Sequence, residues 1–252
     1  MDQHFLVDLR VVDRMVEAAE VGGEDVVVDV GAGRGVIAER LAQKARMVYV
    51  VESDASLRPH LEALKARHGN VRIFIGNFIT LKLPWYNKVV ANPPFSILEP
   101  LIQRHLRNPV KMSLLTPLRF AQRLTENRDS LLKLKTSLSY DLTVVDVFDG
   151  DVFEPPYPGK AALVLFEPAE KSPADRLMLE FLSQRRSKAR NAIRNIFWKT
   201  RSKREATKLV ELSTLDENLL NKPVKRLLYS EAKAVHEFIR KTLDEKASDT
   251  NV

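Results

Sequence analysis

Val26-Val27-Val28-Asp29-Val30-Gly31-Ala32-Gly33-Arg34-Gly35 is the stretch of sequence that decides the fold. Its first five residues are apolar except Asp29, which predicts a strand buried on both faces. The glycines that follow predict a turn whose backbone N–H groups can approach a ligand closely. Val36 to Leu41 then repeats apolar residues at helical spacing. This order of strand, glycine turn and helix places a nucleotide-like ligand at the carboxyl end of a strand in an α/β sheet.

The spacing of the glycines indicates which cofactor binds. Glycines at 31, 33 and 35 give G-x-G-x-G, whereas the dinucleotide fingerprint is G-x-G-x-x-G. A second apolar run, Met47 to Val51, ends in Glu52, about 20 residues after the glycines, where a carboxylate can bind both ribose hydroxyls. With Asp29, this pattern looks like the S-adenosylmethionine (SAM) site of class I methyltransferases. An NAD site is the alternative.

Composition limits the remaining possibilities. The 252 residues can form one α/β domain and a smaller appendage, and the absence of cysteine excludes disulfides and a cysteine-based zinc site. The five histidines show no metal-ligand spacing, so no metal is predicted. No apolar segment approaches the length of a membrane span, and the N-terminus lacks a signal-peptide core. We therefore expect a cytoplasmic protein with no membrane partner, and a monomer.

The order of patterns along the chain predicts two domains. Strands alternate with helices as far as residue 115, and two longer strand-like runs follow at 138–148 and 161–166. This predicts a mostly parallel, Rossmann-like sheet with an antiparallel edge. Ser172-Pro173 is interpreted as a linker, and the chain beyond it is helical and rich in charge. We predict a SAM-binding methyltransferase domain over residues 1–170 and a small all-helical domain over residues 171–252.

The positive charge is concentrated in the second domain. The chain has a net charge of +7, and residues 185–208 carry ten basic side chains against one acid, Glu205. A solvated helix face is the alternative, but so many unpaired like charges repel unless a partner neutralises them. The interleaved apolar residues, including Trp198, are expected on the core side of a helix rather than as base-stacking platforms. We predict contacts with an RNA phosphate backbone from Arg185, Arg186, Lys188, Arg190 and Arg194.

Asn92-Pro93-Pro94-Phe95 follows the fourth predicted strand and suits methyl transfer to an amine conjugated to a base ring, such as N6 of adenine. The Asn92 side-chain oxygen and the Pro93 carbonyl can each accept one N–H, which favours a pyramidal nitrogen whose lone pair points at the methyl group. Proline fixes the orientation of that carbonyl. Phe95 would stack on an unpaired or flipped base. We predict these four residues as catalytic, with an ordinary strand terminator as the alternative.

Three further positions have two interpretations each. Asn77 follows the third strand, where it either holds the adenine amine of SAM or forms a turn. Phe153 opens a proline-rich loop and is either a second stacking face for the target base or a core residue. His4 lies in a segment poised to cover the cofactor, and its alternative role is structural.

Taken together, these segments resemble the ribosomal RNA adenine dimethyltransferase family, KsgA-like with Erm-type relatives. The similarity extends over nearly the whole chain in the same order. The matching segments, with the family pattern in parentheses, are Gln3-His4-Phe5-Leu6 (Q-N-F-L), Val28 to Gly35 (E-I-G-P-G-x-G), Val50 to Asp54 (A-V-E-x-D), Gly76-Asn77 (G-D), Asn92 to Phe95 (N-L-P-Y), Phe153 to Pro156 (F-x-P-P-P) and Arg185 to Lys188 (R-R-K).

The resemblance implies a two-domain, SAM-dependent enzyme that methylates N6 of adenine in ribosomal RNA or a pre-ribosomal subunit, with C-terminal helices that bind RNA. His4, Asn77, Pro93 and Phe95 depart from the family pattern. A small-subunit 3′-end adenine and a large-subunit adenine both stay open as targets, as do mono- and dimethylation. By position, the resemblance implies SAM contacts at His4, Leu6, Gly31, Glu52, Asn77 and Asn92, which join Asp29, Gly33 and Gly35 in the predicted cofactor site.

Two other functions compete with this one. A DNA adenine-N6 methyltransferase would share N-P-P-F, but the sequence has no target-recognition insert. A non-catalytic ribosome-assembly factor that binds RNA would keep the fold without the chemistry. The intact glycine turn, Glu52 and Asn92 favour an enzyme.

Overall fold

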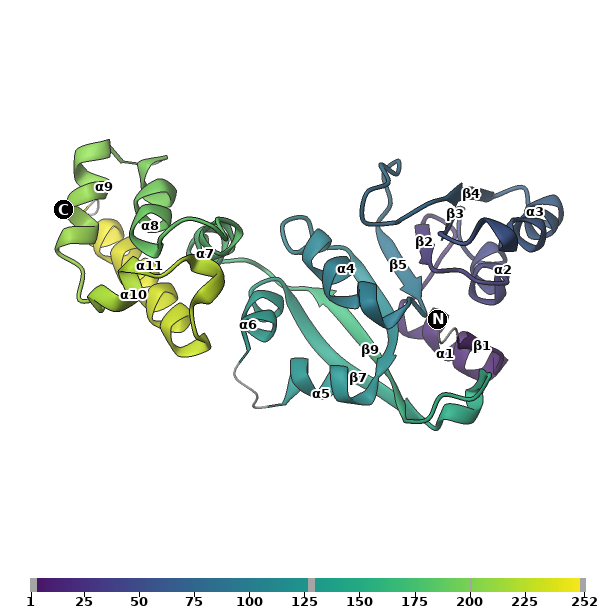
Figure 1. Cartoon of the computed structure of the whole chain (residues 1–252). Coiled ribbons are helices and arrows are strands. Elements are labelled where there is room, and N and C mark those ends of the chain that lie inside the picture. The colour runs from purple at the N-terminus through teal and green to yellow at the C-terminus, as the bar shows by residue number, and fades with distance from the viewer. Residues whose placement is uncertain (1–3, 127–129, 200, 250–252) are drawn as a thin grey trace. The chain divides into compact units, whose positions relative to one another are not determined.

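A computed structural model describes residues 4–126, 130–199 and 201–249 of the chain (Figure 1). Seven strands form one sheet in the order β4-β3-β2-β5-β6-β9-β7. The strands from β4 to β6 are parallel, and β9 is antiparallel to both β6 and β7. The predicted mostly parallel sheet with an antiparallel edge is confirmed. In sheet order, the strands are β4 (Val71–Ile75), β3 (Met47–Glu52), β2 (Val26–Val30), β5 (Lys88–Ala91), β6 (Lys111–Pro117), β9 (Ala161–Pro168) and β7 (Tyr140–Phe148).

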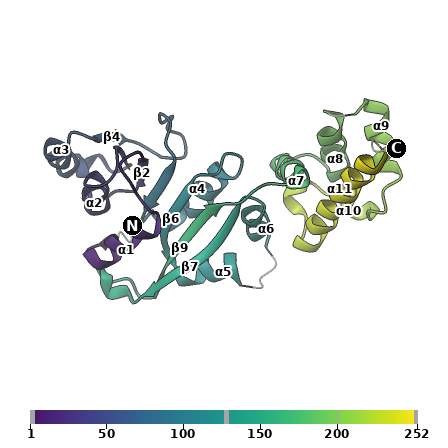
Figure 2. The same ribbon diagram turned by 180° about the vertical axis from the view of Figure 1, so that it is seen from behind.

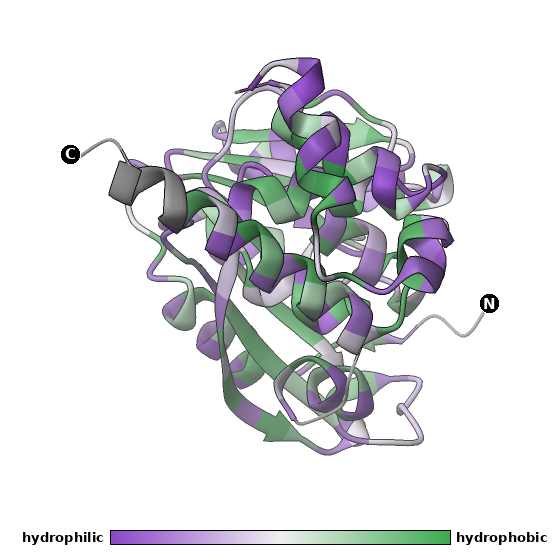
Figure 3. Ribbon diagram, turned by 90° about the vertical axis from the view of Figure 1, so that its left-hand side faces the viewer, coloured by the Kyte–Doolittle hydropathy of each residue, from purple (hydrophilic) through white to green (hydrophobic). Residues whose placement is uncertain are grey.

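The central strand β2 is buried along its whole length, as its apolar sequence predicts, because it lies between β3 and β5 in the sheet. Helices with one apolar face cover the sheet; in α1, the buried residues include Val12, Met15 and Val16. Figure 3 shows apolar residues on the strands and alternating with polar residues along the helices. The helices of this part are α1 (Leu9–Ala18), α2 (Val36–Ala42), α3 (Arg58–Arg67), α4 (Leu98–His105) and α5 (Leu118–Thr125), with short 3₁₀ helices η1 (Ala55–Leu57), η2 (Phe95–Ile97) and η3 (Gly150–Val152).

A second, two-stranded sheet joins the N-terminal segment to the proline-rich loop. β1 (Phe5–Leu6) runs antiparallel to β8 (Phe153–Glu154), with Leu6 opposite Phe153. Two-residue strands are too short to give a periodic pattern, so the sequence did not predict this pairing. It fixes the segment that contains His4 against the loop that follows Phe153.

The chain divides into two compact units. Unit 1 comprises Met1–Glu126 and Tyr140–Pro168, and unit 2 comprises Asn127–Ser139 and Ala169–Val252. The sequence predicts one domain over residues 1–170, and the structure differs in placing residues 130–139 with unit 2. The reason is tertiary packing, because α6 (Leu131–Ser137) contacts α11 (Tyr229–Asp249) and the Ala169 N–H donates to the Ser139 carbonyl at 3.0 Å.

Unit 2 is built of helices, as predicted, and Figure 2 shows α7 to α10 grouped with α11. The expected linker Ser172-Pro173 is instead the start of a helix: Ser172 caps α7 through a capping box, and Pro173 is its first residue. None of the described helices combines the length and apolar character needed to cross a bilayer. The remaining helices are α7 (Pro173–Ser183), α8 (Ala189–Trp198), α9 (Lys203–Glu211), α10 (Glu217–Asn221) and the 3₁₀ helix η4 (Val224–Arg226).

Candidate active site

The predicted cofactor residues meet at one edge of the sheet. The chain order of the strands reverses around β2, which pairs with β3 on one side and β5 on the other. Gly31 follows β2, Glu52 ends β3, and Asn92 follows β5. In open α/β sheets, ligands bind outside the carboxyl ends of the strands at such a reversal. The edge formed by β3, β2 and β5 is therefore the candidate active site.

The glycine turn lies against the Asn92-Pro93-Pro94-Phe95 segment. Gly31, Gly33 and Gly35 all have positive φ values, of +70°, +58° and +86°. A Cβ atom on Gly31 would lie 2.6 Å from Pro94 Cδ, which is closer than such atoms can approach. Glycine is required here both for the backbone conformation and for this contact. The two motifs that the sequence assigned to cofactor and chemistry are thus in contact with each other.

Glu52 connects the glycine turn to the loop that follows β3. Its Oε2 accepts a hydrogen bond from the Gly33 N–H at 2.8 Å. Its Oε1 accepts from the N–H groups of Ser53 and Asp54, at 2.7 and 2.9 Å. The side chain is buried, and the three backbone N–H donors fix its orientation. Each carboxylate oxygen can accept more than one hydrogen bond, so the predicted contact with ribose hydroxyls fits this arrangement.

Asp29 is completely buried in β2, and neither of its carboxylate oxygens has a hydrogen-bond partner at normal distance among the described residues. Burial and the neighbouring Glu52 carboxylate raise the pKa of Asp29 to about 8, which the Ala38 backbone N–H opposes in part. An unsatisfied buried carboxyl group costs free energy unless a ligand or a cation compensates it. SAM carries a positively charged amino group and a sulfonium, so the orphaned carboxyl fits that cofactor.

Asn77 is exposed at the end of β4. Its Oδ1 accepts a hydrogen bond from the Ile79 N–H at 2.9 Å, as the turn interpretation expects. The preceding Gly76 N–H donates to the Glu52 carbonyl at 2.8 Å, so the turn begins beside the predicted ribose site. Its contact with SAM stays a prediction.

The Asn92-Pro93-Pro94-Phe95 segment, called the chemical segment below, contains both a buried ring and an exposed ring. Pro93 is buried after β5, whereas Phe95 is 37% exposed at the start of η2. The Asn92 Nδ2 donates to the His4 carbonyl at 3.4 Å, which turns Oδ1 away from that carbonyl. The Phe95 ring meets Tyr157 edge to face at 5.3 Å between centroids. Both predicted acceptors and the predicted stacking ring are therefore at the same strand end.

The N-terminal segment crosses the glycine turn. His4 Nδ1 lies 2.8 Å from the Pro155 carbonyl oxygen, and a Cβ on Gly33 would lie 3.0 Å from the Phe5 ring. Leu6 is buried in the core, so its side chain packs inside unit 1. Gln3, the first residue of the Q-N-F-L-like segment, lies outside the described residues. The segment lies where the sequence predicted a cover for the cofactor.

The proline-rich loop contains two aromatic residues, Phe153 and Tyr157, which have different surroundings. Phe153 is only 2% exposed and belongs to the core of unit 1, so the core interpretation is the one that its burial supports. Tyr157 lies between His4 and Phe95, at 5.5 and 5.3 Å from their ring centroids. The sequence did not identify Tyr157. The sequence offered one indication of its role, which is its place in the same loop as Phe153. Its ring contacts could not be predicted, because they involve segments distant along the chain.

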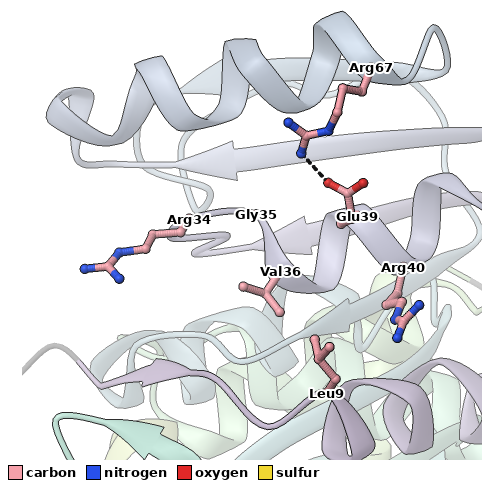
Figure 4. Close-up of a pocket in the computed structure, with 7 residues that line it drawn as sticks. All are labelled: Leu9, Arg34, Gly35, Val36, Glu39, Arg40 and Arg67. Carbon is pink, nitrogen blue, oxygen red and sulfur yellow. Dashed lines mark hydrogen bonds and ion pairs between the residues drawn. The ribbon is translucent and has the colours of Figure 1, made fainter.

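A surface hollow of about 410 Å³ lies beside the start of α2 (Figure 4). It shares only Gly35 with the predicted cofactor site. Arg67 points at Glu39 and forms an ion pair with it. Arg40 pairs with Asp13 at 3.0 Å and Arg34 with Glu154 at 3.9 Å, so each of the three cations that line the hollow already has an acidic partner. Its lining residues are Leu9, Arg34, Gly35, Val36, Glu39, Arg40 and Arg67.

In unit 2, the predicted RNA contacts separate into two groups. Arg185, Arg186 and Lys188 are exposed ahead of α8. Arg190 instead pairs with Glu217 at 2.5 Å, and Arg194 is only partly exposed. The first three residues are therefore free to contact a polyanion, whereas Arg190 already has a carboxylate partner.

Backbone hydrogen bonds bring two more cations to the exposed group. The Lys225 N–H donates to the Arg185 carbonyl at 3.0 Å, and the Val224 N–H donates to the Ser187 carbonyl at 2.9 Å. Lys225 and Arg226 are both exposed on η4. The sequence did not predict this, because the two segments lie about forty residues apart and no local pattern links them. We name these five residues the basic cluster: Arg185, Arg186, Lys188, Lys225 and Arg226.

Comparison with known proteins gives consistent results. A family model described as ribosomal RNA adenine dimethylase matches residues 1–237. The chain is 35% identical over 205 residues to the "Probable ribosomal RNA small subunit methyltransferase A" of Methanococcoides burtonii, covering 76% of each chain. It is 34% identical over 251 residues to the protein of the same name from Methanosarcina mazei, covering 94% of this chain and 91% of the relative.

Two solved structures show the same fold over both units. A dimethyladenosine transferase from Plasmodium falciparum aligns with a TM-score of 0.65 and 20% identity, over 95% of this chain and 98% of its own. The 23S rRNA methyltransferase ErmE aligns with a TM-score of 0.61 and 20% identity, over 94% of this chain and 99% of its own. At these identities, the likeness is one of fold.

Proposed function

Since the chain belongs to the ribosomal RNA adenine dimethylase family, we infer that it is a SAM-dependent enzyme that methylates N6 of adenine in ribosomal RNA. The names of the relatives refer to the small ribosomal subunit, and we propose that small-subunit RNA is the substrate. Neither a DNA substrate nor a non-catalytic role is favoured by these relatives. The monomeric state and the cytoplasmic location stay predictions.

The observation that carries the proposal is the contact between Gly31 and Pro94. It joins the turn at the end of β2 to the segment that would hold the adenine, so a cofactor on the turn and a base on the segment would be neighbours. Positioning of two reactants in this way is the main contribution an enzyme can make to such a transfer.

Each part of the site has a separate task in this proposal. The glycine turn and Glu52 bind SAM. Asp29, which is protonated in the cofactor-free protein, would release its proton and compensate the positive charge of SAM from within the sheet. When bound, SAM supplies an electrophilic methyl group on a positively charged sulfur. The Asn92 Oδ1 and the Pro93 carbonyl accept the two N–H groups of the adenine amine and hold its nitrogen in one orientation. Phe95 stacks on the extruded base.

The basic cluster of unit 2 would bind the RNA phosphates. Its five cations include no member that pairs with an acid among the described residues, so their charge is free for a polyanion. Such contacts position the RNA but do not by themselves select a sequence. Selection of the target adenine then depends on which base can be extruded into the site.

The test is methyl transfer to defined RNA. We expect purified protein with SAM to form N6-methylated adenosine in small-subunit RNA, measured by mass spectrometry of digested product, with large-subunit RNA and DNA of matched length as controls. Asn92→Ala should lower the rate by roughly 100-fold or more while SAM binding weakens only modestly, since Asn92 acts by positioning. Equal methylation of all three substrates would contradict the proposed specificity.

A further inference from the structure

Trp198 ends α8 with much of its ring in solvent. It is 54% exposed, whereas Ile193, Ile196 and Phe197 of the same helix are fully buried. The sequence groups Trp198 with these residues on the core side, and for Trp198 that expectation is wrong. The helix ends at this residue, so the ring extends beyond the packed face. Core packing therefore does not explain this side chain.

The surroundings of Trp198 are cationic. Lys203 Nζ lies 5.6 Å from the centroid of the indole ring. Lys203 also lines a surface hollow of about 740 Å³ along α9, together with Arg204 and Lys208. In the part of the chain that the structure describes, these three cations form no ion pair with an acid. The remaining lining residues are Thr207, Glu211 and Leu212.

Little negative charge opposes these cations. Glu205, on the same helix, accepts the Ser202 N–H at 2.8 Å as part of the capping box at the start of α9. Glu211 is the one acid that lines the hollow. Leu212, at the far end, is 71% exposed and gives the hollow an apolar part. An exposed aromatic plane, an apolar patch and a row of free cations therefore occur together.

We propose that Trp198 and the hollow on α9 bind a single-stranded segment of RNA. One base stacks on the indole ring, and the phosphates beside it lie against Lys203, Arg204 and Lys208. Aromatic planes next to cations are how single strands are bound without sequence preference, because each base has a flat face and each linkage a charge. Bases inside a duplex are already stacked on both sides, so the surface discriminates against double-stranded RNA.

This surface deepens the proposed function, on which it rests, by adding an RNA contact at a second place in unit 2. The basic cluster adjoins the start of α8 and Trp198 ends it. Ten helical residues separate them by about 15 Å at the usual rise per residue. The cluster would bind phosphates of a folded region, and the Trp198 surface an unpaired segment near it.

Fluorescence can test the stacking directly, because the chain has only two tryptophans. In a Trp85→Phe variant, Trp198 is the single tryptophan and can be excited selectively over the five tyrosines. We expect its emission to be quenched by a single-stranded RNA oligonucleotide, but not by the same strand in a duplex or by inorganic polyphosphate of equal charge. Equal quenching by polyphosphate or duplex would show a purely electrostatic surface and overturn the proposal, as would no quenching by the single strand.

Affinity provides the second test. Trp198→Ala should weaken single-strand binding roughly 5- to 150-fold at constant salt, the range for loss of one base–aromatic stack. The salt dependence should be unchanged, because no charge is removed. Trp198→Phe should restore part of the affinity. Trp85→Ala is the matched control, since Trp85 is 67% exposed in unit 1 and should have no effect.

The two proposals fail in different ways. If the wild-type protein does not methylate RNA but Trp198 is quenched by single strands, the methyltransferase proposal fails and the stacking surface stands. If methylation occurs and Trp198→Ala binds single strands as tightly as the wild type, the stacking surface is refuted. Circular dichroism of Trp198→Ala should match that of the wild type, because Trp198 is 54% exposed at the last residue of α8 and is not part of the buried core.

Discussion

Replacing Asp29 by asparagine should change how the stability of the cofactor-free protein depends on pH. Asp29 is fully buried without a hydrogen-bond partner among the described residues, and its pKa is raised to about 8 by burial and by Glu52. The folded protein therefore keeps a proton that the unfolded chain releases at a much lower pH. Asparagine has nearly the same shape but does not titrate.

The expected effect follows from the linkage between proton binding and folding. Between the ordinary pKa of 3.8 and the raised pKa of about 8, the folded state holds one more proton at Asp29 than the unfolded state. Its contribution to stability is therefore complete at low pH and declines as the pH rises toward the folded pKa. The decline is about 1.4 kcal/mol per pH unit, or about 2.7 kcal/mol from about pH 5.5 to about pH 7.5.

Urea unfolding of both proteins without SAM, at the two pH values, measures this effect. Other titrating groups change both proteins equally, and the fixed cost of burying an amide cancels in the comparison. We expect the free energy of unfolding of the wild type to fall by about 2.7 kcal/mol more than that of Asp29→Asn. If the two free energies change in parallel, Asp29 is not held protonated and the reasoning about its burial is refuted.

Three further substitutions test the contact at the site and the basic cluster. Gly31→Ala should destabilise the protein by at least about 1–2 kcal/mol, the cost of a positive φ for a residue with a Cβ, and should lower methyl transfer by displacing Pro94; Gly23→Ala is the matched control, because its Cβ would meet nothing within 4 Å. Thermal unfolding measures the stability and a methyl-transfer assay measures the activity of each variant, and equal stability of the two variants would contradict the close contact. Lys225→Ala and Arg226→Ala should each reduce the slope of log K against log salt for RNA binding by about 0.7–0.9, and an unchanged slope would remove η4 from the RNA interface.

The candidate cofactor site could be predicted because its signals are local. A buried apolar strand, a run of glycines and a second strand that ends in Glu52 each fall within a few residues of sequence. Parallel strands with the same direction bring their carboxyl ends to one edge of a sheet, so the patterns also imply proximity. The alternation of strands and helices along the chain and the helical nature of unit 2 followed from the same kind of periodicity.

Other features depended on contacts between distant segments. The pairing of Leu6 with Phe153 and the place of Tyr157 beside Phe95 could not be predicted, because each joins short segments far apart in the chain. The same holds for Lys225, which joins Arg185 through one backbone hydrogen bond. Residues 130–139 belong to unit 2 for a similar reason, since α6 contacts α11.

The sequence by itself determined the class of fold, the glycine turn and the chemical segment, because these depend on periodicity and on backbone conformations that few residues adopt. Only the tertiary structure decided which side chains of a similar type are exposed to solvent and which are buried or paired with an acid. Trp198 and Phe197 are adjacent apolar residues in one helix, yet one is exposed and the other buried. Arg190 is paired while Arg186 is exposed. Such differences arise from packing between elements, which local sequence does not encode.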